Sequence, residues 1–150
     1  MRALVKFLAS TAFIGYAPVA SGTVASAAAL ACIFVTGEAS VIWWAAGTLI
    51  VGLAISKKAT EVFQSRDPRA FVLDEWCGMF ITMIGLPLDP AFALAGFLLF
   101  RFFDVVKPAG IRRLDQLNHP VGIMLDDVLA GLYSNLILQG VWRLWLKPPL

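Results

Sequence analysis

The sequence predicts an all-α fold: a polytopic transmembrane helical bundle of about five spans, preceded by an N-terminal interfacial or re-entrant helix. Hydrophobic residues make up 59% of the chain and charged residues only 15%, whereas soluble domains average about 45–50% and about 25%. Apolar runs alternate with short polar segments, and none shows the pattern of a strand pair. With 150 residues, the chain is expected to form a single domain over residues 1–150.

The N-terminal segment, residues 1–20, is predicted to be an amphipathic helix at the membrane interface. Arg2, Lys6 and Ser10 recur at helical spacing in an apolar background, a pattern typical of helices that lie among lipid headgroups. The same stretch also resembles a signal peptide, because small residues follow its apolar run. The residues leave open whether this segment spans, dips into or lies flat on the membrane.

Five further apolar runs place helices at residues 23–36, 41–55, 67–86, 89–107 and 122–146. The second run ends at Lys57-Lys58. Asp67-Pro68 and Asp89-Pro90 each combine a capping residue with a first-turn proline, which marks a helix start. Several runs are shorter than the roughly 20 residues of a full span, so short or tilted spans are expected.

Charge placement predicts the orientation. Residues 56–70 and 107–119 are rich in bases, whereas the loops near residues 37–40 and 87–89 contain acids but no base. The positive-inside rule therefore puts both basic segments in the cytoplasm, with five spans and an outside C-terminus. Arg143 and Lys147 argue mildly against that C-terminal side. The cytoplasmic bases are Lys57, Lys58, Arg66, Arg69, Lys107, Arg112 and Arg113. Of these, Lys57, Lys58, Arg112 and Arg113 are expected to attract anionic headgroups.

Carboxylates occur at the cytoplasmic ends of three predicted helices. Asp74-Glu75, Asp104 and Asp126-Asp127 interrupt otherwise apolar runs, where a charge costs a few kcal/mol or more. Adjacent carboxylates at low dielectric repel each other unless a cation lies between them. Because oxygen-only ligands favour a hard ion, we expect these acids to bind Mg²⁺.

Small residues lie one turn beyond both acid pairs. Gly78 follows Asp74-Glu75, and Ala130-Gly131 follows Asp126-Asp127. Helix backbones can approach closely at such positions. We therefore expect the third and fifth predicted spans to pack at this seam and to place the acid pairs opposite one another.

Candidate phosphate ligands flank these acids. Arg101, Asp104 and Lys107 recur every three residues and so share a broad helix face. Arg101 suits forked contacts with phosphate oxygens, and Lys107 acts as a point charge. Ser21-Gly22-Thr23 precedes a helix, where hydroxyl and free N–H groups can hold an anion.

Each motif alone has a more ordinary explanation. Acid pairs at helix starts usually compensate the helix dipole, Arg101 with Asp104 is usually a structural ion pair, and residues 21–23 are usually an N-cap. Asp115 and His119 are expected to be solvated loop residues rather than ligands. The one-sided placement of acids from three helices nevertheless favours a functional site.

These features predict hydrolysis of a lipid phosphate by a metal-activated water, with Asp104 as a ligand or general base. Covalent routes are disfavoured by the residues present. Cys32 and Cys77 do not begin a cysteine-phosphatase loop, no DxDxT motif occurs, and one histidine cannot form a two-histidine site. Both cysteines are expected to be small buried apolar residues. The order of the acids also differs from that of the CDP-alcohol phosphotransferases.

Four ordered blocks resemble the phosphatidylglycerophosphatase A family: "APVASGTVAS", "VLDEWCGMFITM", "GFLLFRFFDVVKPAGIRRLD" and "GIMLDDVLAG". The resemblance implies a multi-pass enzyme of the bacterial cytoplasmic membrane. Such an enzyme converts phosphatidylglycerol phosphate to phosphatidylglycerol with Mg²⁺ at the cytoplasmic leaflet, in the cardiolipin pathway. The sequence departs from the family pattern at "NHPVG", where members carry a glycine-rich approach to the last block.

The resemblance implicates nine residues. We expect Asp74, Glu75, Asp126 and Asp127 to bind metal, Asp74, Glu75, Asp104 and Asp127 to act in catalysis, and Ser21, Thr23, Arg101 and Lys107 to bind substrate. The expected partners are an anionic phospholipid and the membrane, without nucleic acid, and an oligomer cannot be derived from the residues. Alternatives left open are a metal-dependent phosphatase of another lipid or polyprenyl phosphate, a divalent-cation transporter and a small scaffold subunit.

Overall fold

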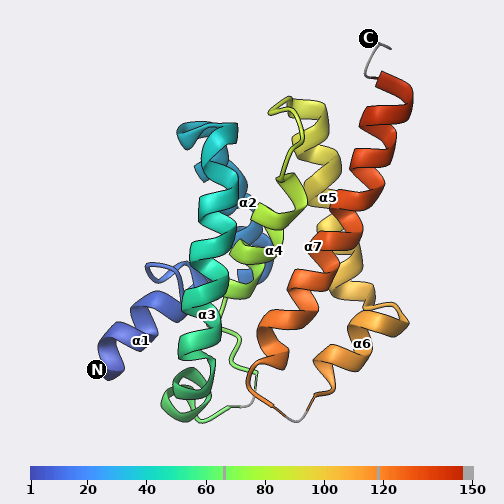
Figure 1. Ribbon diagram of the computed structural model, residues 1–150. Helices are drawn as coiled ribbons and strands as arrows, with labels where there is room; N and C mark the ends of the chain where they lie inside the picture. Colours follow the sequence, from blue (N-terminus) through green and yellow to red (C-terminus); the bar gives the residue numbers. More distant parts are fainter. Residues whose placement is uncertain (66, 118, 147–150) are drawn as a thin grey trace.

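The computed structural model describes residues 1–65, 67–117 and 119–146. Over these residues the chain is a bundle of α-helices with no strand, which confirms the all-α prediction (Figure 1). The helices are α1 Arg2–Ala9, α2 Ser21–Thr36, α3 Val41–Phe63, α4 Leu73–Met83, α5 Pro90–Val106, α6 Ala109–Asp115 and α7 Gly122–Val141. Short 3₁₀ turns occur at Ile14–Tyr16 and Glu38–Ser40, and a π-helical turn, Trp142–Leu146, follows α7.

Within the described residues, only Glu38–Phe63, which is α3 with the turn before it, is long and apolar enough to cross a membrane. The apolar helix α2 is shorter, and α4 has 11 residues. At about 1.5 Å per residue, α4 falls well short of a hydrocarbon core of about 30 Å. A bundle with five complete spans is therefore not confirmed.

Two predicted helix boundaries are wrong. The second predicted helix does not end at Lys57-Lys58, since α3 continues to Phe63. Ser56 and Ala59 are buried on either side of the two lysines, so this part of the helix packs against the bundle. Asp67-Pro68 does not open a helix either, since α4 begins at Leu73. The N–H of Phe71 instead donates to the Pro68 carbonyl at 2.7 Å and closes a turn there.

The start signal at Asp89-Pro90 is confirmed. The Asp89 carboxylate accepts hydrogen bonds from the N–H groups of Ala91 and Phe92, at 2.8 and 3.4 Å, and Pro90 occupies the first helical turn. Helix α5 then ends where predicted, with Lys107 in the left-handed conformation at φ 46°. The short helix α6 lies in the segment that the sequence predicted to be a basic loop.

The N-terminal segment packs against the rest of the bundle. Helix α1 buries Val5 and Ala9 and contacts α3. The Ala9 carbonyl accepts a hydrogen bond from the Val72 N–H at 2.9 Å, and Gly15 lies against the Ala70 carbonyl. Helix α1 has 8 residues and is therefore about 12 Å long, too short to cross a bilayer.

Helix α4 is the centre of the bundle and lies between α3 and α7 (Figure 1). Its most extensive partner is α7, and a Cβ added to Gly131 would lie 2.5 Å from the Gly78 carbonyl oxygen. The predicted seam between Gly78 and Gly131 is thus confirmed as a direct backbone contact. At the far end, the Asn135 side-chain amide donates to the Thr82 and Ile84 carbonyls at 2.9 and 2.8 Å. These bonds satisfy carbonyls that the end of α4 leaves free.

Many large apolar side chains face outward. Val35 is 86% exposed, Trp43 77% and Leu144 82%, and α2, α3, α5 and α7 all carry further examples. Exposed large apolar side chains on several helices are typical of surfaces that contact lipid or another protein. The outer surface is therefore suited to contact with lipid.

Candidate active site

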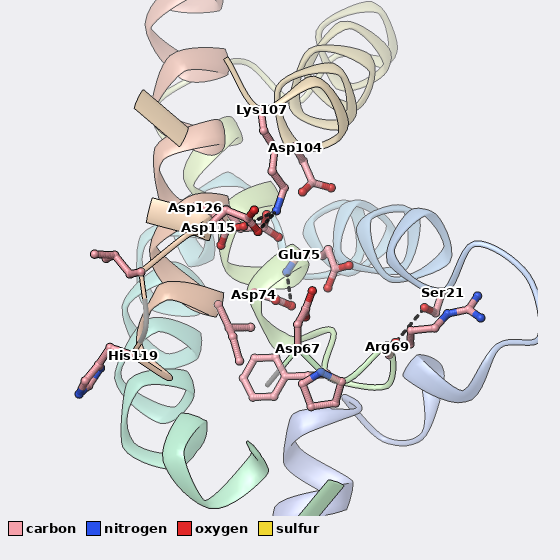
Figure 2. A pocket seen from close by; sticks show the side chains of 15 residues that line it. Ser21, Asp67, Arg69, Asp74, Glu75, Asp104, Lys107, Asp115, His119 and Asp126 are labelled. Atoms are coloured by element: carbon pink, nitrogen blue, oxygen red, sulfur yellow. Dashed lines mark hydrogen bonds and ion pairs between the residues drawn. The ribbon is translucent and has the colours of Figure 1, made fainter. Parts of the chain in front are cut away.

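One end of the bundle contains a cleft with a volume of about 220 Å³. Its walls come from the start of α2, the turn before α4, the starts of α4 and α7, the end of α5, and α6 with the segment after it (Figure 2). The acidic residues that line it are Asp67, Asp74, Glu75, Asp104, Asp115, Asp126 and Asp127. All five carboxylates predicted to converge therefore lie in one cleft.

Asp74, Glu75 and Asp127 form the tightest group. One carboxylate oxygen from each lies within 4.8 Å of the other two. The seam between Gly78 and Gly131 explains this convergence, because each acid lies about one turn before a glycine where the two backbones touch. The Glu75 N–H donates to Asp74 Oδ1 at 3.0 Å, which fixes the Asp74 side chain at the start of α4.

The three carboxylates lack a cationic partner among the described ion pairs. Asp74 and Asp127 are only 7% and 3% exposed, and Glu75 Oε2 is buried without a hydrogen-bond partner. Buried like charges repel strongly unless a positive charge lies between them. A metal ion would supply that charge, and oxygen-only ligands suit a hard divalent cation. The acidic cluster therefore fits a metal site.

Lys107 bridges two other acids. Its Nζ lies 2.6 Å from Asp126 Oδ2 and 2.6 Å from Asp115 Oδ1, above Glu75 in Figure 2. Burial alone would lower the pKa of Lys107, but the hydrogen bonds to Asp115 and Asp126 outweigh it and raise the pKa above its ordinary value. Lys107 is therefore a permanent positive charge at the edge of the cleft. The other oxygen of Asp126, Oδ1, is buried without a partner.

Arg101 and Asp104 form an ion pair on α5, with Arg101 Nη1 2.7 Å from Asp104 Oδ2. Asp104 lines the cleft and lies next to Asp127, whereas Arg101 is not among the lining residues. The Arg101 guanidinium instead lies against α2, 3.5 Å from Ser26 Oγ. The ion pair that was the alternative interpretation of Arg101 is thus present, and Asp104 at the same time faces the carboxylate cluster.

Of the residues at the start of α2 that were predicted to bind an anion, only some line the cleft. Ser21 lines the cleft, and its hydroxyl donates to the Arg69 carbonyl at 3.0 Å. Gly22 packs directly against the Glu75 carboxylate, so any side chain there would displace it. Thr23 is half-buried and does not line the cleft.

Four charged or titratable cleft residues were not predicted to lie in the site: Asp67, Arg69, Asp115 and His119. Asp67 and Arg69 lie there because the chain turns at Pro68 instead of starting a helix, and Asp115 lies there because α6 folds back beside Lys107. His119 also lines the cleft, although its ring is turned away from the carboxylates in Figure 2. Its Nδ1 accepts the Val121 N–H at 3.3 Å. No local sequence pattern marked these residues, because turns and chain reversals bring them to the cleft.

The remaining predicted residues lie outside the cleft. Lys57, Lys58, Arg112 and Arg113 are exposed, as headgroup contacts would require. Cys77 is buried, Cys32 is half-buried, and both are free thiols. Arg66 and Lys147 lie outside the described residues.

Comparison with known proteins identifies the family. The sequence profile of phosphatidylglycerophosphatase A matches residues 7–142. The chain belongs to this family. Membership makes it a phosphatase, and the phosphatidylglycerophosphatase A resemblance of the four sequence blocks is confirmed.

Three relatives support the assignment. A phosphatidylglycerophosphatase A of Escherichia coli is 32% identical over 87% of this chain and 79% of its own length. One of Haemophilus influenzae is 38% identical over 63% of this chain and 61% of its own length. A Bacteroides thetaiotaomicron protein, provisionally named a phosphatidylinositol-3-phosphatase, is 33% identical over 83% of this chain and 84% of its own length. No solved structure matches the chain.

Proposed function

We propose that this phosphatase hydrolyses the terminal phosphate of phosphatidylglycerol phosphate to give phosphatidylglycerol, with Mg²⁺ as cofactor, at the cytoplasmic face of the bacterial inner membrane. One observation carries the proposal: Asp74, Glu75 and Asp127 gather three carboxylate oxygens within 4.8 Å of one another, and among the described residues none of the three forms an ion pair with a lysine or arginine. Family membership supports the reaction, and the outward-facing apolar side chains support the membrane setting.

The role proposed for each residue follows from its contacts in the cleft. Asp74, Glu75 and Asp127 hold the cation, and Asp126 joins them through its unpartnered Oδ1. When bound, Mg²⁺ supplies an activated water and neutralises part of the phosphate charge. Asp104, next to Asp127, is positioned to accept a proton.

The substrate contacts come from the other walls. Lys107 offers a fixed positive charge to the phosphate, and Ser21 offers a hydroxyl from another wall of the cleft. Arg101 and Thr23 lie just outside the cleft, on α5 and α2. We assign them to the parts of the lipid that lie beyond the reacting phosphate.

A second substrate class is favoured by one relative. The Bacteroides thetaiotaomicron protein carries the provisional name phosphatidylinositol-3-phosphatase. The substrate in that name, phosphatidylinositol 3-phosphate, is also a phosphomonoester on a lipid headgroup. A panel of phosphatidylglycerol phosphate, phosphatidylinositol 3-phosphate and a polyprenyl phosphate would rank the candidates. The proposal requires the highest kcat/KM for phosphatidylglycerol phosphate.

The deciding experiment is phosphate release by the purified protein from phosphatidylglycerol phosphate, with Mg²⁺ and with chelator. We expect turnover with Mg²⁺, none with chelator, and none in Asp127→Asn under either condition. Glu61→Gln is the matched control, because Glu61 is an exposed acid on α3 outside the cleft. Undiminished turnover in chelator, or in Asp127→Asn, would exclude the proposed metal mechanism.

The orientation has its own test. A cysteine at Arg112, an exposed position on α6, should react with a membrane-impermeant maleimide in inverted membrane vesicles and not in intact spheroplasts. The test uses a Cys32→Ala background, because Cys32 is a half-buried free thiol, and Cys77 is buried and should remain unlabelled in both. Labelling in spheroplasts would place the cleft on the opposite side.

A further inference from the structure

A second cavity lies between α2 and α5, separate from the cleft. It is a groove of about 420 Å³ walled by apolar side chains, chiefly Ala27, Ala31 and Phe34 of α2 and Ala93, Leu94 and Phe97 of α5. The two alanines of α2 are exposed and give the groove its depth, while Phe34 and Leu94, 46% and 59% exposed, form its rims. Its volume lies within the range of small-molecule sites, but it has no charged lining that could bind a polar ligand.

The groove and the cleft share the same two helices. Ser21 at the start of α2 and Asp104 near the end of α5 line the cleft, and the groove follows farther along both helices. At about 1.5 Å per residue, the groove begins about 8 Å from Gly22 and extends about 10 Å farther to Phe34. One leaflet of hydrocarbon is about 15 Å thick. The groove therefore covers the depth occupied by the tail of a lipid whose headgroup lies in the cleft.

Thr23 and Arg101 connect the two cavities. Thr23 lies four residues before Ala27, and Arg101 lies four residues after Phe97, so each shares a helix face with a groove residue. Arg101 also reaches across to α2, where its Nη1 contacts Ser26 Oγ at 3.5 Å. These two candidate ligands, which do not line the cleft, thus lie at the junction where a lipid's polar and apolar parts meet.

We propose that the groove between α2 and α5 binds an acyl chain of the phospholipid substrate whose phosphate occupies the cleft. This inference rests on the proposed function. It assigns Thr23 and Arg101 to the glycerol region of the lipid and makes the enzyme selective for chain length. Because the groove and the cleft follow one another along the same helix pair, this occupant is favoured over a second copy of the chain.

The test compares dipalmitoyl and dihexanoyl phosphatidylglycerol phosphate in detergent micelles. Ala31→Phe fills the groove, and Ala46→Phe makes the same change at an exposed alanine of α3 outside both cavities. We expect Ala31→Phe to lower the ratio of long-chain to short-chain kcat/KM about tenfold, as when a few methylenes lose their burial. Ala46→Phe should leave that ratio unchanged. An unchanged ratio in Ala31→Phe, or equal changes in both variants, would overturn the proposal.

A binding measurement separates this inference from the proposed reaction. A phosphatidylglycerol with a diazirine on one acyl chain, in phosphatidylcholine vesicles, should label wild-type residues of the groove, and Ala31→Phe should reduce that labelling. If the wild type hydrolysed neither substrate, the proposed reaction would fail while groove labelling would still support acyl binding.

Labelling spread evenly over α3 would instead indicate contact with bulk lipid. Conversion of a dimer to a monomer by Ala31→Phe would indicate that a second copy of the chain occupies the groove. Either result would overturn the acyl-chain assignment.

Discussion

The α4–α7 pair and the α2–α5 pair both end at the same cleft, but their packing differs. In the first pair, Gly131 lies against the Gly78 backbone, and Asn135 binds carbonyls at the end of α4. The second pair makes fewer contacts and leaves an apolar groove between its helices. Close backbone packing therefore occurs where carboxylates must be held together, and looser packing occurs where an apolar ligand has room.

The charges of the two pairs differ in the same way. Within the part of the chain that the structure describes, Asp74 and Asp127 on α4 and α7 form no ion pair, whereas Asp104 on α5 is paired with Arg101 at 2.7 Å. Unpaired buried charges destabilise a fold, and paired ones do so far less. The tight pair thus carries the electrostatic strain that a metal ion would relieve, and the loose pair does not.

The largest expected effect comes from Asp74→Asn compared with Asp104→Asn. Each should reduce phosphate release at least about a hundredfold, because each removes a group proposed to act on the metal or the water. Their effects on stability without divalent ions should differ. Asp74→Asn only relieves repulsion and should not lower the thermal midpoint, whereas Asp104→Asn also removes the ion pair with Arg101, a loss on the order of 1 kcal/mol that offsets the repulsion relieved at Asp127.

Thermal melts in detergent, with chelator and with Mg²⁺, measure this difference. Mg²⁺ should raise the midpoint of the wild type and should not raise that of Asp74→Asn. A clear drop in the midpoint of Asp74→Asn under chelator would show that the unpaired carboxylates are not under strain.

An intermediate effect is expected from adding one methyl group to the seam. A Cβ at position 131 would lie 2.5 Å from the Gly78 carbonyl oxygen, which belongs to backbone and cannot move aside. Gly131→Ala should therefore destabilise the protein by about 1–3 kcal/mol. Gly47→Ala on α3 is the control, since nothing lies within 4 Å of the new methyl group. That variant should gain up to about 1 kcal/mol from helix propensity. Equal midpoints for the two variants would contradict close packing at the seam.

The smallest effect is expected from Asp115→Asn. Asp115 is 39% exposed in its pair with Lys107, and pairs exposed to that degree are typically worth about 0.2–1 kcal/mol. Lys107 keeps its second partner, Asp126, at 2.6 Å. We therefore expect KM to rise by up to about fivefold, with kcat nearly unchanged, and Asp115→Glu to restore KM. A loss as large as that of Asp74→Asn would place Asp115 among the metal ligands.

The carboxylate cluster was predictable because its energetic signal is local. Acids inside apolar runs are costly, so their positions predict that something compensates them. Gly78 and Gly131 likewise indicated which helices pack closely, because small residues at helical spacing permit backbone contact. The signal at Asp89-Pro90 was correct for the same reason, since its hydrogen bonds lie within one turn.

The features that were missed depend on contacts distant in sequence. Asp67-Pro68 carries the same local signal as Asp89-Pro90, yet the Val72 N–H binds the Ala9 carbonyl and the chain between them turns into the cleft. Helix α6 follows the left-handed Lys107, whose side chain binds Asp115 after the chain reverses. The sequence pattern contained no signal for either contact, and the groove between α2 and α5 depends on which helices become neighbours in the fold.

The bond between Ala9 and Val72 bears on proteolytic maturation. Val72 is fully buried, so a peptidase that removed the first twenty or so residues would leave its amide without an acceptor, at a cost of about 1–3 kcal/mol. It would also uncover the turn that brings Asp67 and Arg69 to the cleft. The N-terminal segment, although it resembles a leader peptide, thus supports the turn before α4. Its removal would destabilise the part of the protein that forms the cleft.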